Sequence, residues 1–337
     1  MPPDGGAVTP LARVSVVVPV LDEQQVLPAF YARLKAVLAT LPDASEVIFI
    51  DDGSTDRTPQ LLDEWAAADP TIRVIHFSRN FGHQAALTAG LDHASGDAVV
   101  LIDADLQDPP ELISTFHARW REGYQVVLGR RRSRDEGLVM RGLYHFFYKT
   151  LHLLADIDIP LDSGDFSLMD RSVVNALRRL PERTRFLRGL RSWVGLKQVA
   201  VDYDRPARES GESKYTMAKL LKLAFDGIVS FSAAPLRLAL LFGALISLAG
   251  FVLIGVLFYL RLRHAFDLPG WTSLMVVVLF LGGIQLLAVG IVGEYIARIY
   301  EEVKDRPVYL VARSAGFPTP SAGAAEPAPI AGLTAST

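Results

Sequence analysis

Acidic side chains gather at the end of one apolar segment, in the stretch VLIDADLQDPPE. Asp103 and Asp105 follow the apolar residues 98–102, and side chains two positions apart on an extended chain point to the same side. Two carboxylates held close together resist joint ionisation. A solvated loop that opens a helix at Pro109 and Pro110 is one explanation, because proline suits the first helical turn. A divalent cation that neutralises both carboxylates is the other.

A second acidic pair stands in the stretch IDDGSTD. Asp51 and Asp52 precede Gly53, which permits a tight turn, and Ser54 can cap the following helix. A simple turn between a strand and a helix is therefore one interpretation. Carboxylates at a strand end can also accept hydrogen bonds from a ribose or a base edge, as in dinucleotide sites.

Phosphate groups would need a holder other than a glycine-rich loop, because no such pattern follows the first apolar segment. A hard cation on Asp103, Asp105 and the Gln107 oxygen would hold them. Mg²⁺ typically takes one or two carboxylates and completes its shell with substrate phosphates and water. The cation interpretation thus explains how the two acids can stay ionised side by side.

The elements that carry these residues alternate between strand-like and helix-like patterns. Strands are expected at 14–18, 46–50, 73–77, 98–102 and 125–128, and helices at 23–41, 55–68, 83–93 and 110–122. Nearly all-apolar strands separated by helices predict an α/β fold whose mostly parallel sheet is covered on both faces. In such sheets ligands lie beyond the carboxyl ends of the strands, where both acidic pairs stand.

Composition limits the classes of function. The chain has 337 residues, a net charge of −3 and 50% hydrophobic residues, so neither its charge nor its composition suggests a bulk nucleic-acid binder. It has no cysteine, which excludes disulfides, cysteine zinc sites and thiol nucleophiles. The first residues lack a basic-then-apolar pattern, so a cleaved signal peptide is not expected.

Hydrophobicity is concentrated late in the chain. Two segments, about 238–260 and 273–296, are long enough to cross a ~30 Å hydrocarbon core as helices. Lys and Arg flank the pair on its outer sides, which predicts a multi-pass plasma-membrane protein with both termini in the cytoplasm. Stretches 139–156 and 216–232 have amphipathic spacing and would pack on the sheet or lie in the membrane interface.

These patterns predict a domain order. It comprises a flexible N-terminus (1–13), a cytoplasmic catalytic domain (14–235), two transmembrane helices (236–297), a cytoplasmic segment (298–314) and a disordered tail (315–337).

Five motifs in order resemble one family. They are VVVPVLDE ending at Glu23, DDGS (51–54), DADLQDPPE (103–111), SGDFSLMDR (163–171) and RESGESKY (208–215), followed by the two apolar segments. Together they resemble the polyprenyl-phosphate glycosyltransferases, which are inverting enzymes of the GT-A fold related to dolichyl-phosphate mannose synthase. The similarity is greatest to bacterial undecaprenyl-phosphate glucosyltransferases, and it covers roughly residues 14–312.

The resemblance implies a role for each matching residue. Pro19, Glu23, Asp51 and Asp52 would line the nucleobase and ribose pocket, with Asp103 and Arg130 near the sugar-nucleotide phosphates. Asp103, Asp105 and Gln107 would hold Mg²⁺ or Mn²⁺. Asp165 matches the position of a catalytic base, and the acceptor phosphate would be held by Arg141, Arg208, Ser213 and Lys214. The stretch PVLDE lacks the aromatic residue of the commoner family form, so Leu21 cannot stack on a base as a ring would.

The resemblance also implies the reaction. A UDP-sugar, UDP-glucose above others, would donate its sugar to undecaprenyl or another polyprenyl phosphate at the membrane surface, and the enzyme would be a homo-oligomer, a tetramer in close relatives. One alternative is a processive polysaccharide synthase, although RGLRSW (188–193) only partly matches its Gln-x-x-Arg-Trp motif and more membrane spans would be needed. Another is a membrane-tethered nucleotide-binding module without catalysis, against which Asp103, Asp105 and Asp165 argue.

Overall fold

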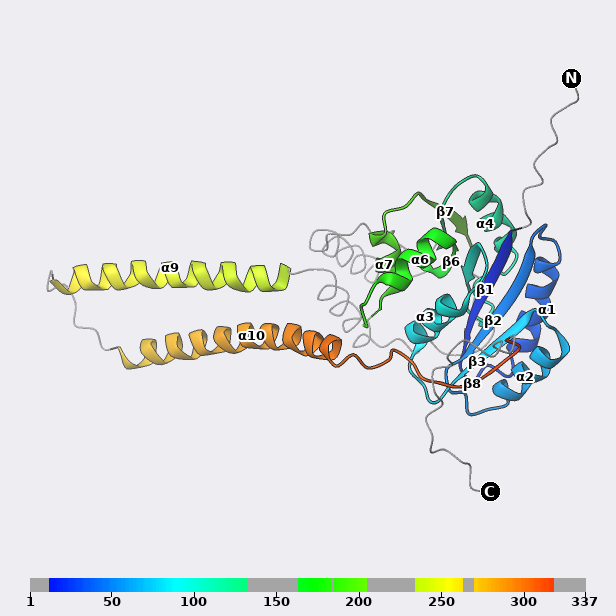
Figure 1. Cartoon of the computed structure of the whole chain (residues 1–337). Coiled ribbons are helices and arrows are strands. Elements are labelled where there is room, and N and C mark those ends of the chain that lie inside the picture. Colours follow the sequence, from blue (N-terminus) through cyan, green and yellow to red (C-terminus); the bar gives the residue numbers. More distant parts are fainter. Residues whose placement is uncertain (1–11, 132–162, 184, 205–233, 263–269, 318–337) are drawn as a thin grey trace, which may run out of the picture. The chain divides into compact units, whose positions relative to one another are not determined.

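Figure 1 shows the computed structural model of the chain, which divides into two compact units. It describes residues 12–131, 163–183, 185–204, 234–262 and 270–317. The first unit comprises residues 1–128, 165–174 and 309–337, and the second comprises 129–164 and 175–308. The amphipathic helices predicted over 139–156 and 216–232 lie outside the described residues, as do nearly all of the predicted N-terminal segment and tail.

A mostly parallel sheet forms the first unit. Its strands are β1 (Arg13–Val20), β2 (Ala44–Asp51), β3 (Ile72–Phe77), β4 (Ala98–Leu101), β5 (Val126–Arg131), β6 (Ser163–Asp170) and β8 (Val311–Ala315). They lie in the order β5-β6-β4-β1-β2-β3-β8. Strands β4, β1, β2 and β3 run parallel to one another, whereas β6 is antiparallel to β4 and β8 to β3. The predicted α/β fold with a mostly parallel sheet is therefore confirmed.

The helices of the first unit lie close to their predicted positions. They are α1 (Leu27–Leu38), α2 (Thr58–Ala68), α3 (His83–His93) and α4 (Leu112–Arg121). Proline stands in the first turn of α1 and of α2, where its fixed φ suits a helix and its missing N–H costs no bond. The helix predicted from residue 23 begins four residues later, because residues 23–26 form turns that tie the loop after β1 to its neighbours.

Helix α3 is packed more closely than the other helices. Residues 85–91 are all buried, and the helix contacts β1 and β2. At Gly90 an added Cβ would lie 2.0 Å from Cγ1 of Val17, so only glycine allows α3 to approach β1 this closely. This contact matters for the site, because α3 begins at His83 beside the carboxyl ends of the strands.

The second unit contains shorter elements and two long helices. Its elements are α7 (Leu187–Trp193), β7 (Gln198–Tyr203), α9 (Ala234–Leu262) and α10 (Trp271–Val303), and α6 (Arg171–Arg179) runs into it from the first unit. Strand β7 is the neighbour of β5 at the end of the strand order, on the side opposite β6. Residues 129–131 of β5 belong to the second unit. Helices α9 and α10 contact each other.

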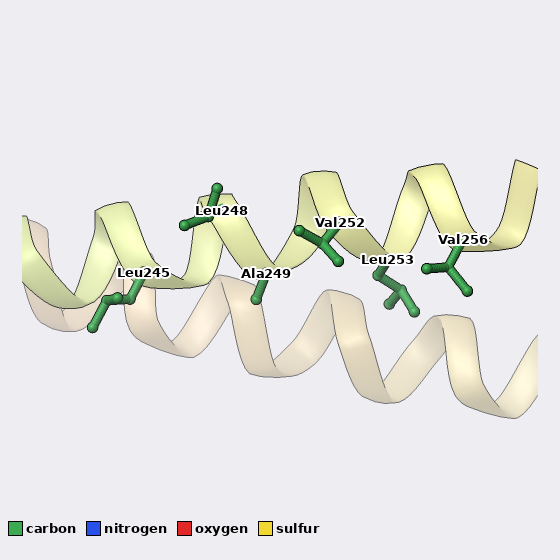
Figure 2. A pocket seen from close by; sticks show the side chains of 6 residues that line it. All are labelled: Leu245, Leu248, Ala249, Val252, Leu253 and Val256. Carbon is green, nitrogen blue, oxygen red and sulfur yellow. The ribbon is translucent and has the colours of Figure 1, made fainter.

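Both long helices expose apolar side chains. Leu240 and Phe251 of α9 are about three quarters exposed, as is Leu286 of α10. Figure 2 shows six side chains of α9 that line an apolar pocket, namely Leu245, Leu248, Ala249, Val252, Leu253 and Val256. Exposed apolar surfaces of this extent mark contact with another apolar phase or partner.

One of the two predicted spans has the composition of a membrane helix. Among the described residues, Val277–Val303 is long and apolar enough to cross a bilayer, and a shorter apolar stretch covers Ala239–Leu253. Both predicted spans are helical, but the crossing of a membrane by either helix stays a prediction. Helix α10 also continues to Val303, beyond the predicted end near residue 296. Strand β8 lies in the predicted cytoplasmic segment except for Ala315, so the predicted disordered tail begins too early.

Replacing the small residue at the α3–β1 contact tests this packing. We expect Gly90→Ala to lower the free energy of unfolding by about 1–3 kcal/mol, because the new methyl group overpacks the space occupied by Val17. Urea unfolding of the full chain in detergent would measure the change. In the Val17→Ala background the same substitution should cost less, and equal costs in both backgrounds would contradict the contact.

Candidate functional site

The carboxyl ends of four parallel strands place the loops of the site at one edge of the sheet. These loops follow β1, β2, β3 and β4. Of the residues predicted here, Pro19 is buried within β1, opposite Ile50 of β2. Glu23 is half-buried in the next loop, and its amide donates to Thr58 Oγ1 at 3.0 Å. The loops after β1 and β2 are thus joined into one wall.

A left-handed residue helps to join these two loops. Asp22 has a φ of 54°, and its Oδ1 accepts the amide of Thr55 at 2.7 Å. In return, the Asp22 amide donates to Ser54 Oγ at 3.0 Å. The prediction that Ser54 caps the following helix is therefore wrong, because its hydroxyl is committed to the neighbouring loop and α2 begins only at Thr58.

The adjacent carboxylates Asp51 and Asp52 are both buried, and each holds a different part of the wall. Asp51 Oδ1 accepts the amide of Ser54 at 2.9 Å, and Oδ2 lies 2.7 Å from His76 Nδ1. Asp52 accepts the amides of Phe81 at 2.7 Å and Gly82 at 2.9 Å, so it fixes the loop that leads into α3. Burial raises the pKa of Asp52, against these amide bonds that lower it.

Gly53 allows the loops after β2 and β3 to touch. Its φ is +76°, and an added Cβ would lie 2.6 Å from the carbonyl carbon of Arg79. A residue with a side chain would therefore be strained by its backbone angle and would also collide with the next loop. The sequence DDGS is required at this point for geometry as well as for charge.

His83 joins two acidic residues that are far apart in the sequence. Its Nε2 lies 3.3 Å from Asp165 Oδ2 and 3.7 Å from Asp103 Oδ1. The side chain of Asp165 is buried, whereas those of Asp103 and His83 are 33% and 42% exposed. Strands β4 and β6 thus bring Asp103 and Asp165 to a common side chain, while the separate roles expected for them stay predictions.

Negative charge at this point exceeds positive charge. Burial, together with the nearby carboxylates of Asp165, Asp108 and Asp105, raises the pKa of Asp103 to about 6, while His83 opposes this shift. Four carboxylates therefore act on the same small volume beside one histidine.

The turn after Asp103 contains a left-handed residue and an unpartnered amide oxygen. Leu106 has a φ of 58°, which is left-handed and uncommon for a non-glycine residue. The next amide, of Gln107, donates to Asp105 Oδ1 at 3.0 Å. The Oε1 atom of Gln107 is buried and has no hydrogen-bond partner, a costly state unless a cation or a donor supplies one.

These residues fit a divalent cation. Two carboxylates, an unsatisfied amide oxygen and a surplus of negative charge form a hard-oxygen donor set that leaves positions for phosphate oxygens and water. A ready-made cluster of three or more acidic or histidine ligands is absent from the described part of the chain. The set therefore suits a cation that arrives with its phosphate ligand better than one held by protein alone.

The other predicted site residues have different outcomes. Arg130 at the end of β5 forms a bidentate ion pair with Asp202 of β7. Its Nε lies 2.5 Å from Oδ1, and its Nη2 lies 3.0 Å from Oδ2. Its phosphate role stays a prediction. The residues predicted to hold the acceptor phosphate lie outside the described residues, and they are Arg141, Arg208, Ser213 and Lys214.

Sequence reasoning missed His83 and His76. Each has a local signal, since His76 lies at the end of a strand and His83 opens the helix that follows. Their partners Asp51 and Asp165 are 25 and 82 positions away, so the contacts themselves could not be inferred from spacing.

Family models and relatives agree on the kind of protein that this chain resembles. The model described as glycosyl transferase family 2 matches residues 15–178, and the one described as GtrB C-terminal hairpin matches residues 234–299. The uncharacterized glycosyltransferase YkcC of Bacillus subtilis (strain 168) is 49% identical over 304 residues, which cover 90% of this chain and 94% of that protein. The bactoprenol glucosyl transferase of Shigella phage SfII is 42% identical over 303 residues, covering 90% and 98%.

Among solved structures, glucosyl-3-phosphoglycerate synthase from Mycobacterium tuberculosis, in complex with Mn²⁺, UDP and glucosyl-3-phosphoglycerate, has a TM-score of 0.45 and 21% identity. The match covers 65% of this chain and 78% of that chain. This likeness is too low to support a statement about the site.

The charge surplus predicts that Asp103 destabilises the fold at neutral pH. Because its pKa is raised in the folded state, ionisation costs stability as pH rises from about 4 to about 6, and the loss persists above that range. At pH 7.5 in EDTA, Asp103→Asn should therefore have a free energy of unfolding higher than that of the wild type, and it should unfold at a higher temperature. The expected gain is on the order of 1 kcal/mol for this partly exposed carboxylate.

Thermal unfolding of the full chain in detergent would measure this gain, which should vanish near pH 4. The exposed carboxylate of Glu122, paired with Arg119 at the end of α4, offers the control Glu122→Gln. A wild type as stable as Asp103→Asn at pH 7.5, or a gain shared by the control, would show that the charges at this site do not strain the fold.

Proposed function

The chain belongs to glycosyltransferase family 2, and on that premise we propose that it transfers glucose from UDP-glucose to a polyprenyl phosphate with inversion. The acceptor and the sugar are suggested by the bactoprenol glucosyl transferases, to which the chain is similar along nine tenths of its length. The meeting of Asp103 and Asp165 at His83 carries the proposal, because a donor phosphate and an acceptor must be adjacent for direct transfer.

The proposed reaction is a single displacement. An oxygen of the lipid phosphate attacks the anomeric carbon, the bond from that carbon to the diphosphate oxygen breaks, and UDP leaves with the bonding electrons. A bound Mg²⁺ or Mn²⁺ would supply electrostatic stabilisation of the departing diphosphate. Asp103, Asp105 and Gln107 are the residues of this chain that would hold it.

Asp165 has a different task in this proposal. A phosphate monoester has its second pKa near ~6, so the acceptor is largely a dianion at neutral pH and carries little need for a general base. Asp165 is buried and held by His83, so its carboxylate has a fixed direction. We assign it to orienting the acceptor or to stabilising positive charge that develops on the sugar ring.

The donor pocket in this proposal is the wall formed by the loops after β1 and β2. Glu23 lies in the first loop and Asp51 ends β2 just before the second, and the two loops are joined through Asp22, Ser54 and Thr55. Hydrogen-bond acceptors at the carboxyl ends of strands β1 and β2 suit the ribose and base of a nucleotide. With Leu21 in place of an aromatic residue, base recognition would depend on these polar contacts.

Membrane attachment follows from the acceptor. A polyprenyl tail stays in the bilayer, so transfer must occur at the membrane surface, and the apolar helices α9 and α10 would anchor the enzyme there. We propose that both helices cross the plasma membrane and leave the catalytic unit and both termini in the cytoplasm. A homo-oligomer remains a prediction from the family resemblance.

Substituting Asp165 tests the reaction. Purified full chain in nanodiscs would receive radiolabelled UDP-sugars and undecaprenyl phosphate, and lipid products and released UDP would be counted. We expect one glucose per lipid and one UDP per glucose. Asp165→Asn should lower kcat by about 10²–10⁴-fold, whereas Glu122→Gln should not.

Other outcomes of this assay decide between functions. A product with many sugars per acceptor would indicate a polysaccharide synthase. Nucleotide binding without transfer would indicate a non-catalytic module, and near-normal turnover by folded Asp165→Asn would remove the role given to this residue.

Removing the divalent cation tests the cation-binding role proposed for Asp103, Asp105 and Gln107. Excess EDTA should abolish transfer, and added Mg²⁺ or Mn²⁺ should restore it for the wild type. Asp105→Asn should lower activity at least about 10²-fold and weaken the divalent-dependent binding of UDP, because one of two charged ligands is lost. Full transfer in EDTA, or divalent-dependent UDP binding unchanged by Asp105→Asn, would contradict the assignment.

A further inference from the structure

The last strand of the sheet is contributed by the chain that follows the apolar helix α10. Strand β8 pairs antiparallel with the edge strand β3. Tyr309 stacks on Phe77 with ring centroids 5.1 Å apart and donates to Asp92 at 3.1 Å, and the carbonyl of Leu310 accepts the amide of Ser78. The segment is therefore attached along its length rather than at one contact.

Arg313 stands opposite His76 in this pairing, and the two residues share a partner. Arg313 lies 2.7 Å from Asp63 Oδ2 and 2.8 Å from Oδ1. Asp63 Oδ1 lies 3.1 Å from His76 Nε2, and His76 Nδ1 lies 2.7 Å from Asp51 Oδ2. Four side chains from β8, α2, β3 and β2 thus form one continuous chain of charge-assisted contacts.

The exposed fraction of the side chains increases along this series of contacts, from Asp51 to Arg313. The side chains of His76 and Asp51 are each 4% exposed, whereas Asp63 is 35% and Arg313 51% exposed. A buried carboxylate is costly unless it is paired, so Asp51 depends on His76. The two ring nitrogens of His76 lie within hydrogen-bond distance of Asp51 on one side and Asp63 on the other. Arg313 then balances the second carboxylate, Asp63.

Asp51 in turn shapes the loop that forms the proposed nucleotide pocket. Its other oxygen accepts the amide of Ser54, the residue whose hydroxyl receives the Asp22 amide. Any rotation of the Asp51 carboxylate would therefore disturb both loops of the pocket wall. His76 prevents that rotation by holding Oδ2 while Ser54 holds Oδ1.

We infer that His76, Asp63 and Arg313 are positioning residues for Asp51, so that the strand after the membrane helix forms part of the donor site. The inference rests on the proposed function, because it gives Asp51 a task in nucleotide binding. These three residues would not touch the substrate. They would act on donor affinity by fixing one carboxylate, and acceptor binding would not depend on them.

Arg313→Gln tests the inference without placing a new charge or removing the strand. In the full chain in nanodiscs, the Kd for UDP and the KM for UDP-glucose should rise about five- to tenfold, with kcat and the KM for polyprenyl phosphate little changed. Arg313→Lys should recover part of the loss, because it keeps a positive charge beside Asp63. Tyr309→Phe is the matched control, since it removes a hydrogen bond from the same segment but leaves the charged chain intact.

A double substitution distinguishes positioning from simple loosening of the sheet edge. In the Asp51→Asn background, Arg313→Gln should change the Kd for UDP by less than about twofold, because the residue that it positions has already been altered. Equal losses in both backgrounds would overturn the inference, as would wild-type UDP affinity in Arg313→Gln itself.

Hydrogen exchange separates this inference from the proposed function. Arg313→Gln should speed the exchange of amides in residues 51–55, and Tyr309→Phe should not. If the wild type transfers no sugar to any polyprenyl phosphate, the proposed function fails. Hydrogen exchange would still show whether Arg313 positions the loop that begins at Asp51. Unchanged exchange in residues 51–55 would overturn the positioning role, and faster exchange there would support it without reference to transfer.

Discussion

An excess of buried and half-buried carboxylates at one edge of a parallel sheet is the constraint on which the rest of the structure depends. Asp103 lies among Asp105, Asp108 and Asp165, and the ring of His83 lies beside it. Such a cluster costs folding free energy, so it must be held by surrounding packing. The close fit of α3 on β1, with glycine at the contact, supplies part of that support.

Two kinds of carboxylate meet at this edge, and they differ in how they are satisfied. Asp22 and Asp52 are bound to backbone amides, and Asp51 to an amide and to His76, so their charges are largely used in fixing loops. Around Asp103 the surroundings differ, since three further carboxylates help to raise its pKa and the Gln107 oxygen in the same loop is without a partner. In the proposed function, the first kind of carboxylate builds the pocket wall, and the second kind, with the Gln107 oxygen, would hold a cation.

The lateral edge of the sheet, at strand β3, gives a reason for the chain to return to the sheet after its apolar helices. An unpaired edge strand exposes backbone donors and acceptors, and β8 covers those of β3. It also brings Arg313 to Asp63, at the outer end of a chain that reaches Asp51. One short segment thus closes the sheet edge and, in our proposal, also fixes the wall of the nucleotide pocket.

Local pattern was enough to predict the first four strands and helices, because burial on both faces of a parallel sheet leaves nearly all-apolar runs. The rule that parallel strands end at one edge also placed Asp51 and Asp103 there before any coordinates were known. Motif order gave the family. The predicted roles of Pro19, Glu23 and Arg130 stay predictions, and Arg130 is paired with Asp202.

Contacts between distant residues were decided only by the tertiary structure. His83 meets Asp165 across 82 positions, Arg313 meets Asp63 across 250, and Ser54 binds the Asp22 amide instead of capping α2. Periodicity records which face of an element is buried, but it does not record strand order, and strand order sets which loops become neighbours. The sequence by itself therefore determined the elements and the chemical class of the site, and the folded sheet decided which side chains share it.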